Sequence, residues 1–512
     1  MQGWTEGYVG GIGYIHAFYR ELSPALLSFA LTLRGWRPPM DLAGSFACAE
    51  IGCGHGVSSA VLAGCHPDAR FEAVDFNPGH IAGAQRLAAE AGLGNAAFLE
   101  ESFADYAHAG GQNGTKDLDI VTLHGVWSWV SAENRAILVD LLKRRLKPGG
   151  LVFVSYNALP GTLAYMPLRR VLVEHCADRT GPLPERIEEA VAFASRLTAL
   201  NAGWFAQADA LPARLDSLKR KSPNYIAHEY LNRDWTAFYH ADVARELAAA
   251  KLDFAGPAVP MEQMDELSLP PDALPLLAEA RDPAYRETLR DLLTNRAFRR
   301  DLFVKGAERL TAAERRDRLR AIRFALLVLP DDLPEMVLAP VGRVPLPQDL
   351  HGPLAEALAA GTPTLGELAA LPALARHGEE AVLRALMILT SLALVAPALP
   401  EAGQAARALQ ADRFNAAILE RNRRDDTLDT LASPVLGSGV AVSRLEALFL
   451  LALRSGVDPA ATAWETLSAD GLALSRDGVR LDGEEANLVE LRARFDRFTR
   501  LRLPTLRRLG VA

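Results

Sequence analysis

The residues best suited to chemistry form the glycine-rich stretch Glu50-Ile-Gly52-Cys-Gly54-His-Gly56. It follows a short apolar run and precedes a helical pattern. Glycines at these positions let the backbone bend tightly and approach a ligand closely. Free N–H groups at the start of the following helix would then face that ligand. The spacing is GxGxG rather than the GxGxxG of dinucleotide binders, and no GK[ST] follows, so a triphosphate cradle is not expected.

A carboxylate follows at the end of the next predicted strand. Asp75, in Ala73-Val-Asp-Phe-Asn77-Pro, can accept hydrogen bonds from both hydroxyls of a ribose, as its counterpart does in nucleotide-binding folds. Asn77 lies beside it and is a further candidate for cofactor binding. Ser102 and Phe103 close the third predicted strand, where an adenine ring could be held. Together these positions predict a nucleoside site.

These residues sit in a strand–helix alternation over residues 45–155. Strands are expected at 46–51, 71–74, 96–99, 118–123 and 151–155, with helices at 79–91 and 132–146 among the connections. Unpatterned apolar strands that alternate with helices indicate a doubly wound, Rossmann-like sheet covered on both faces. Residues 252–256 are expected to return one more strand to this sheet. The turn signal KPGG at 147–150 is expected to precede the fifth strand.

Two more motifs follow strand ends in this scheme. LHGVWSWV (123–130) follows the fourth strand and SYNALPG (155–161) follows the fifth. Ligands bind outside the carboxyl ends of such strands, so both motifs are expected beside the nucleoside. His124, Trp127, Trp129, Tyr156 and Asn157 are the candidates for contact with a second substrate and for catalysis, and His124 is also a candidate for cofactor binding. Aromatic faces attract a methylammonium or sulfonium group by about 1–2 kcal/mol when desolvated. Packing of one tryptophan under the next helix is the alternative, and we expect Trp127 to line the pocket and Trp129 to pack.

The segments EIGCGHG and VDFNP resemble the nucleoside-binding motifs of class I S-adenosylmethionine methyltransferases. The resemblance implies that Gly52, Gly54 and Gly56 line the methionine and ribose moieties, and that Glu50 orders the turn and the amino-acid end. It also implies that Asp75 holds the ribose. Ser102 stands where many of these enzymes have an acid that accepts from the adenine amino group, so the chain departs from the pattern there.

A narrower resemblance covers about residue 14 to at least residue 310. LHGVWSWV, SYNALPG, PLR (167–169) and HEYL (228–231) are together similar to a bacterial subfamily in which a methyltransferase domain is joined to a methyltransferase regulatory domain. That group includes lysine methyltransferases acting on outer-membrane proteins. The resemblance implies S-adenosylmethionine as cofactor and a protein lysine as acceptor.

The chain length of 512 residues is typical of two to four domains. We expect a methyltransferase domain over 1–262 with a helical insertion at about 162–235, a helical middle or regulatory domain over 263–340, and a helical, winged-helix-like C-terminal domain over 341–512. A proline-rich linker is expected at 268–277, and the mixed charge of 282–325 predicts a solvated helical bundle. Residues 385–396 are too few to cross a bilayer and predict a buried helix.

Charge and cysteine content limit the other functions. The net charge is −8, and residues 351–400 hold only Arg376 and Arg384 against four glutamates, so the winged-helix-like unit is poorly suited to DNA. A non-enzymatic winged-helix regulator and a small-molecule methyltransferase, with the C-terminal half as lid or dimer interface, are the alternatives. No metal site is expected: the four cysteines lack paired spacing, and His228-Glu229 lacks the HExxH pattern. The start of the chain does not resemble a signal peptide, so a cytoplasmic protein without membrane or nucleic-acid partners is expected. The sequence leaves its oligomeric state open.

Overall fold

The computed structural model describes residues 7–10, 12–109, 117–306 and 308–512. The expectation about a signal peptide concerned the start of the chain, where residues 1–6 and 11 lie outside the described residues. Within the described ranges, no helix combines the length and the apolar character that a membrane crossing requires.

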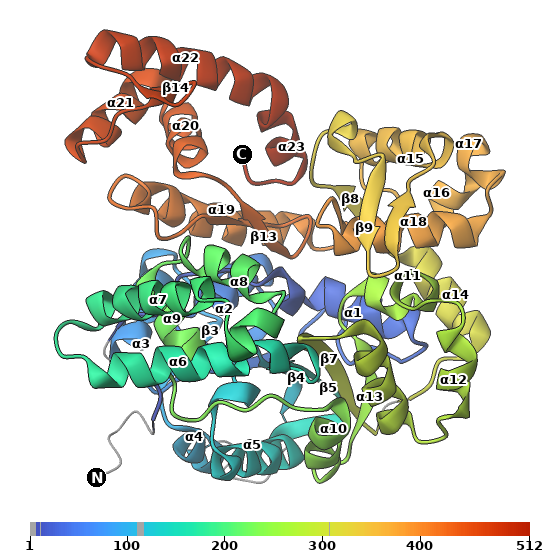
Figure 1. Cartoon of the computed structure of the whole chain (residues 1–512). Helices are drawn as coiled ribbons and strands as arrows, with labels where there is room; N and C mark the ends of the chain where they lie inside the picture. The colour runs from blue at the N-terminus through green and yellow to red at the C-terminus, as the bar shows by residue number, and fades with distance from the viewer. Residues whose placement is uncertain (1–6, 11, 110–116, 307) are drawn as a thin grey trace.

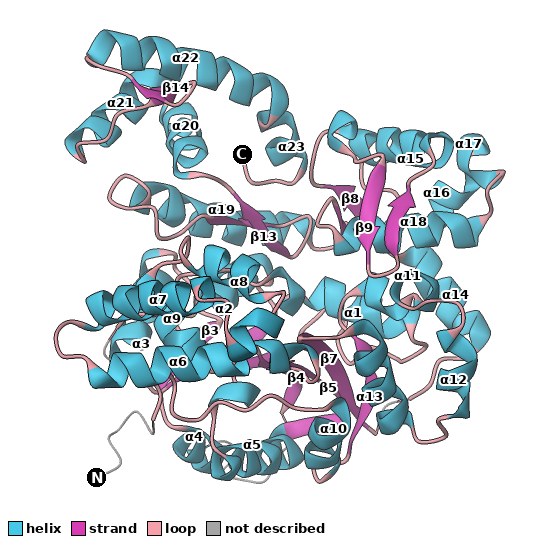
Figure 2. Cartoon of the chain, viewed as in Figure 1, coloured by secondary structure: helices cyan, strands magenta, loops and turns pink. Residues whose placement is uncertain are grey.

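A seven-stranded sheet forms the centre of the N-terminal half (Figure 2). Its strand order is β3-β2-β1-β4-β5-β7-β6, and every neighbouring pair is parallel except the two that involve β7. The strands are β1 (Ala47–Ile51), β2 (Arg70–Asp75), β3 (Ala96–Glu100), β4 (Leu118–Leu123), β5 (Leu146–Asn157), β6 (Leu252–Pro257) and β7 (Phe298–Lys305). The expected Rossmann-like sheet is confirmed, with one antiparallel strand inserted beside β5.

Strand β7 corrects the expectation of an all-helical segment at 282–325. Its residues Leu302, Phe303 and Val304 are fully buried, and β7 lies between β5 and β6. The many charged residues in and around 298–305 favoured an exposed helix in the sequence, although this segment is a core strand. The sheet therefore extends past residue 262, where the methyltransferase domain was expected to end, and the domain limits themselves remain a prediction.

Helices cover both faces of the sheet because successive strand side chains point to opposite sides. On one face, Cys48, Phe71 and Phe153 pack under α1, α2 and α3, together with helices from the C-terminal region. On the other face, Ala49, Val121 and Val154 pack under α4, α5 and α10. These helices are α1 (Pro24–Leu33), α2 (Val57–Cys65), α3 (Pro78–Glu90), α4 (Phe103–Ala109), α5 (Ala132–Arg145) and α10 (His240–Ala248).

The turn expected at 147–150 lies inside a longer strand. β5 begins at Leu146, and Gly149 takes a φ of 82° while the register with β4 shifts near Leu118 and Ile120. A positive φ inside a strand is typical of a bulge, and glycine adopts it without strain. The glycines therefore form a bend within β5, and not a turn that precedes the strand.

The segment expected as a helical insertion forms a small core of its own. Leu172, Val191 and Leu215 are among its buried side chains, and Figure 1 shows these helices gathered in front of α2 and β3. Its members are α6 (Met166–Asp178), α7 (Leu183–Ala199), α8 (Leu211–Leu218) and α9 (Pro223–Tyr230).

The proline-rich stretch expected as a linker is folded. It contributes to α11 (Asp265–Ser268) and α12 (Ala273–Glu279), and Leu269, Ala273 and Leu277 form a small buried cluster. The following α13 (Pro283–Thr294) packs beside α10. Pro283 opens α13, because a missing N–H costs nothing in the first turn of a helix.

The C-terminal half is mainly helical, as expected, and rests on the sheet domain (Figure 1). Gly64 of α2 lies so close to Phe414 that an added Cβ would be 3.0 Å from the phenyl ring, and His66 contacts the carbonyl oxygen of Gly437 at 2.9 Å. The apolar run 385–396 was expected to form a buried helix, but helix α18 ends at Ser391 and the run continues through a turn into strand β11, which begins at Val395. The elements are α14 (Ala312–Ala321), β8 (Arg323–Leu326), β9 (Met336–Ala339), β10 (Gly342–Pro345), α15 (Gln348–Ala360), α16 (Leu365–Ala370), α17 (Pro372–Ala375), α18 (Glu379–Ser391), β11 (Val395–Ala398), α19 (Gln404–Arg421), β12 (Thr430–Ser433), β13 (Ser438–Ala441), α20 (Arg444–Ser455), α21 (Pro459–Ala469), β14 (Ser475–Arg476), β15 (Val479–Arg480), α22 (Glu484–Leu501) and α23 (Leu503–Arg508).

Candidate active site

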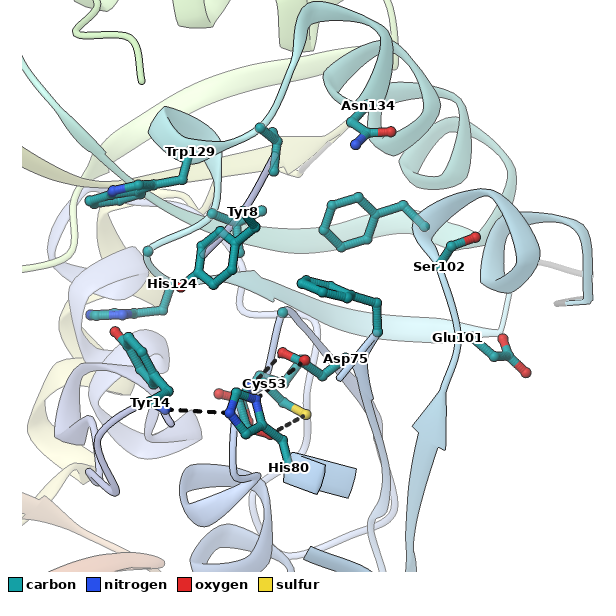
Figure 3. A pocket seen from close by; sticks show the side chains of 18 of the residues that line it. Tyr8, Tyr14, Cys53, Asp75, His80, Glu101, Ser102, His124, Trp129 and Asn134 are labelled. Carbon is teal, nitrogen blue, oxygen red and sulfur yellow. Dashed lines mark hydrogen bonds and ion pairs between the residues drawn. The ribbon is translucent and has the colours of Figure 1, made fainter. Parts of the chain in front are cut away.

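A deep pocket opens at the carboxyl ends of β1, β2, β3 and β4 (Figure 3). Its volume is about 1070 Å³ when the open mouth is included. Such a position is the usual ligand site of a doubly wound sheet. It is lined by Tyr8, Tyr14, Tyr19, Glu50, Gly52, Cys53, Gly54, Asp75, Phe76, His80, Glu101, Ser102, Phe103, His124, Gly125, Val126, Trp129, Val130, Ser131, Asn134 and Asp234.

The glycine turn forms one wall of the pocket. Gly52, Gly54 and Gly56 all take left-handed backbone conformations, with φ of 72°, 54° and 66°. A Cβ on Gly52 would lie 2.7 Å from Val126, and one on Gly56 would lie 2.5 Å from Phe98. Both conformation and space therefore require glycine. Gly52 and Gly54 line the pocket, whereas Gly56 packs against the core, which corrects its expected place at the cofactor.

Asp75 lies at the base of the pocket and is fixed by two backbone N–H groups. Its Oδ2 accepts from Gly54 N at 2.9 Å, and its Oδ1 accepts from Asn77 N at 2.9 Å. Asn77 was expected beside the cofactor, but its side chain accepts from Gly79 N at 2.9 Å and caps α3. It is not among the lining residues, because an N-cap side chain turns back toward its own helix.

The far end of the pocket holds the residues that follow β3. Ser102 and Phe103 line it as expected, but Ser102 Oγ donates to Asp105 Oδ2 at 2.7 Å and accepts from Asp105 N. The neighbouring Glu101 also lines the pocket, and its Oε2 is buried without a hydrogen-bond partner among the described residues. Burial first, and then Asp105, raise the pKa of Glu101. An unpaired carboxylate oxygen in this region can accept a hydrogen bond from a ligand.

Glu50 is buried at the end of β1 beside the glycine turn. Its Oε2 accepts from Ser59 Oγ at 2.5 Å. Burial raises its pKa to about 7, and the hydrogen bond from Ser59 only partly opposes this effect. Glu50 is therefore balanced between its neutral and charged forms near neutral pH, and a cationic ligand group beside it would favour the charged form.

His124 lies in the pocket wall as expected. Its ring stacks on Tyr19 with centroids 3.9 Å apart, and its Nε2 is 3.6 Å from Glu21 Oε1. Burial opposes ionisation of Glu21, but its hydrogen bond with His124 and the charges of His124 and Arg300 lower its pKa to about 2. A carboxylate in this position orients the imidazole ring.

The two tryptophans of the WSW motif are assigned in reverse to our expectation. Trp127 is fully buried beneath the sheet face and does not line the pocket, whereas Trp129 does. The chain forms a 3-10 turn over Trp127–Trp129. In such a turn residues two apart point in different directions, so only one indole faces the ligand space. The indole N–H of Trp129 has no hydrogen-bond partner among the described residues.

Tyr156 and Asn157 lie outside the pocket, which corrects their expected place at the acceptor. Tyr156 is fully buried, and its hydroxyl donates to Asp301 Oδ2 at 2.7 Å. Asn157 is buried and its backbone N–H donates to Ser128 Oγ. Because strand side chains alternate, Tyr156 points to the face covered by α5 and α10, where Asp301 holds it.

Sequence reasoning missed the segment that closes the pocket. Residues 7–10 and 12–19, which we call the N-terminal strap, place Tyr8, Tyr14 and Tyr19 on the pocket wall. Figure 3 shows Tyr8 between His124 and Asp75, and Tyr14 below His124. The dense tyrosine and glycine content of YVGGIGYIHAFY was the available signal, but no spacing rule assigns such a segment to a site.

The strap is fixed by hydrogen bonds to α9, to the loop after it and to the glycine turn. Val9 N donates to Asn232 Oδ1 at 2.9 Å, and Asn224 Nδ2 donates to Gly13 O at 2.9 Å. His228 Nε2 lies 3.1 Å from Ile12 O, and His55 Nε2 lies 3.1 Å from Tyr14 O. The HEYL motif therefore packs against the strap. Within the described ranges, no group of three or more His, Cys, Asp or Glu side chains is placed to hold a metal ion.

The three strap tyrosines are neutral phenols at ordinary pH. Burial raises the pKa of Tyr8, Tyr14 and Tyr19. Tyr14 raises the pKa of Tyr8 and of Tyr19 further, whereas Tyr19 partly opposes the rise at Tyr14. Neutral phenols beside Trp129 give a desolvated, aromatic wall. Such a wall disfavours an ammonium ion by desolvation while offering oxygen acceptors to an amine.

Comparison with known proteins places two recognised segments in the chain. Residues 49–150 match the family described as "Methyltransferase domain", and residues 222–305 match the one described as "Predicted methyltransferase regulatory domain". The second match contains α9 and the core strand β7. The strap is therefore anchored by the segment that matches the regulatory domain.

Similar proteins are found over the whole length. The chain is 37% identical over 509 residues to the protein sll1526 of Synechocystis sp., covering 99% of this chain and all of that one. It is 25% identical over 319 residues to RP789 of Rickettsia prowazekii, covering 61% of this chain and 55% of that one. The structure of PKMT2 from Rickettsia typhi in complex with AdoHcy superposes with a TM-score of 0.72 at 19% identity, covering 98% of this chain and 100% of that chain. The last likeness shows a shared fold.

Proposed function

We propose, because the chain belongs to the family of S-adenosylmethionine-dependent methyltransferases that carry a methyltransferase regulatory domain, that it methylates the side-chain amine of a protein lysine. Methyl transfer and its cofactor rest on that membership. The lysine acceptor is the proposed part. The motif resemblance to lysine methyltransferases of outer-membrane proteins supports it.

The pocket fits the cofactor on its own geometry. A turn that only glycine can form approaches a carboxylate fixed by two backbone N–H groups, and a buried carboxylate oxygen of Glu101 is unpaired at the far end. We assign Asp75 to the ribose, Gly52 and Gly54 to the close backbone approach, and Phe103 to the adenine. Glu50 is assigned to the amino-acid end.

The bound cofactor supplies an electrophilic methyl group on a sulfonium. The protein must hold the acceptor amine in line with it and keep that amine neutral. Tyr14, Tyr19 and Trp129 form the desolvated wall that favours the neutral amine. His124, oriented by Glu21, lies on the same pocket wall and is assigned to contact with the acceptor.

The observation that carries the proposal is the aromatic wall next to the glycine turn. Trp129 and the strap tyrosines line the same pocket as Asp75 and Gly54. Desolvation beside this wall lowers the pKa of an aliphatic amine, so the neutral amine that can attack the methyl group is favoured there. The small-molecule acceptor, the alternative weighed from the sequence, is separated from the lysine acceptor by experiment.

The test incubates the purified protein, cell-extract proteins and S-adenosylmethionine that carries a labelled methyl group. Label that stays with protein after precipitation supports the proposal. Label found only in extractable metabolites would assign a small-molecule acceptor instead. The Asp75→Ala variant serves as the control, because its weaker cofactor binding should leave far less label in either fraction.

A further inference from the structure

A second hollow lies beside the edge strand of the sheet, between the end of α1, the face of α10, the start of β6 and α13. Its volume is about 1860 Å³ when the open mouth is included. We call it the arginine cleft. It is lined by Arg34, Trp36, Ala241, Ala244, Arg245, Ala248, Leu252, Asp253, Phe254, Asp265, Ala280, Arg281, Asp282, Pro283, Ala284, Arg286, Glu287, Arg290 and Arg309.

The arginine cleft is separate from the active-site pocket. It contacts the first residues of β6, Leu252 to Phe254, and β6 runs parallel to β5 because both are antiparallel to β7. The pocket lies at the opposite, carboxyl end of the parallel strands, and the two share no lining residue. A ligand in the arginine cleft would therefore not touch the transferred methyl group.

The cleft carries positive charge on a chain whose net charge is −8. Six arginines line it against four carboxylates. Arg290 is paired with Asp265 at 2.7 Å and with Glu287 at 3.3 Å. Arg34, Arg281 and Arg286 have no ion pair within the described part of the chain. Their guanidinium groups can donate hydrogen bonds to the anionic groups of a ligand without breaking an existing ion pair.

Two of the arginines are held in position before any ligand arrives. The stem of Arg34 crosses Gly256, where an added Cβ would lie 2.9 Å from Arg34 Cγ. Arg309 Nη1 donates to Arg34 O at 3.1 Å, and its guanidinium lies 3.5 Å from the centre of the Trp36 ring. Burial first, with Arg290 and Arg309 adding to it and Glu287 opposing it, lowers the pKa of Arg34. An anion placed there would relieve this repulsion.

The floor of the cleft is apolar and made of small side chains. Ala241, Ala244 and Ala248 are spaced so that they share one face of α10, and Leu252 and Phe254 continue the floor onto β6. Small side chains let another backbone approach closely. A floor of this kind beside fixed arginines suits a peptide with both apolar and acidic residues.

We propose that the arginine cleft binds a peptide segment of a partner protein in which glutamate or aspartate residues alternate with apolar ones. The carboxylates pair with Arg34, Arg281 and Arg286, and the apolar side chains rest on the alanine face of α10. Most of the lining belongs to the segment that matches the regulatory domain, and Arg34, Trp36 and Arg309 lie outside that segment. This inference does not depend on which acceptor is methylated.

The test measures binding of a fluorescein-labelled synthetic peptide of alternating glutamate and leucine to the full-length protein by fluorescence anisotropy. The variants are Arg34→Met, which keeps the stem that crosses Gly256, and Arg286→Gln. Arg492→Gln, at an exposed position of α22 far along the chain, is the matched control. Melting temperature and calorimetric binding of S-adenosylmethionine establish that each variant is folded.

The wild type and Arg492→Gln should bind the peptide equally, with affinity that falls as salt is added. Each cleft substitution should weaken binding about tenfold, as expected when one charge-assisted hydrogen bond is lost. Equal binding by the cleft variants and the control would overturn the proposal. Equal binding of a peptide with glutamine in place of glutamate would also overturn it. So would a protein that binds inorganic polyphosphate but does not bind the glutamate peptide.

Discussion

Asp75 Oδ2 accepts a hydrogen bond from Gly54 N at 2.9 Å, which joins the end of β2 to the glycine turn after β1. Gly54 holds a φ of 54°, and its Cα lies so close to Tyr14 of the strap that an added Cβ would be 3.2 Å from the ring. One carboxylate thus fixes the turn that the strap covers. Several consequences of this arrangement can be measured.

Replacing Asp75 with alanine should weaken S-adenosylmethionine binding about 100-fold, because hydrogen bonds to a charged group are lost together with the anchor of the turn. Isothermal titration calorimetry measures the effect. Asp68→Ala, at an exposed position beyond α2, is the matched control and should bind as the wild type does. Unchanged affinity in Asp75→Ala would remove Asp75 from the cofactor site.

Cofactor affinity should rise with pH up to about 7. Burial raises the pKa of Glu50 to about 7, so below that pH the free protein holds Glu50 protonated. A cationic amino group binds better to the carboxylate, and binding at low pH must release this proton. Affinity should therefore fall by up to about tenfold per pH unit below 7.

Calorimetry at several pH values checks this dependence, and titrations in buffers of different ionisation enthalpy report the released proton. Glu50→Gln cannot ionise, so its affinity should be low and the same across this pH range. A wild-type affinity that does not change between pH 5.5 and pH 8 would contradict the assignment of Glu50 to the amino-acid end.

Tyr19→Phe should lower kcat about tenfold while leaving cofactor affinity within about twofold, because the hydroxyl serves the acceptor side and the stacked ring is retained. Steady-state kinetics measures kcat, with the protein fraction that the enzyme methylates as the substrate. Calorimetry measures the cofactor affinity. If both quantities stay at the wild-type values, the hydroxyl has no part in positioning the acceptor.

Tyr156→Phe should reduce the free energy of unfolding by about 1–3 kcal/mol and change kcat by no more than about twofold. The substitution leaves Asp301 without the donor at 2.7 Å but touches no residue of the pocket wall. Chemical denaturation and kinetics measure the two effects. A large loss of kcat in a stable Tyr156→Phe protein would restore Tyr156 as a catalytic residue.

The sequence predicted the cofactor side of the site better than the acceptor side, for a physical reason. The glycine turn and Asp75 follow from local rules: a backbone that needs left-handed conformations, and a strand end that faces the ligand edge. The pocket indeed contains Glu50, Gly52, Gly54 and Asp75. Asn77 and Gly56 occur in the same motifs but serve the helix cap and the core.

The acceptor side depends on which way each side chain turns, and that is decided by packing. Trp127 and Trp129 exchanged their expected roles because the motif forms a 3-10 turn. Tyr156 points toward Asp301 on β7, and the sequence did not predict that strand because its segment is rich in charged residues. The strap tyrosines reach the pocket through contacts with α9, more than 200 residues further along the chain, and no local pattern predicts such a contact.

The most direct test of the central claim is tandem mass spectrometry of extract proteins after reaction with the purified protein and a cofactor that carries a deuterated methyl group. The account predicts deuterated methyl groups on lysine side-chain nitrogens with the wild type and far fewer with Asp75→Ala. Label on another residue type, or on no protein while metabolites are labelled, would contradict the lysine acceptor.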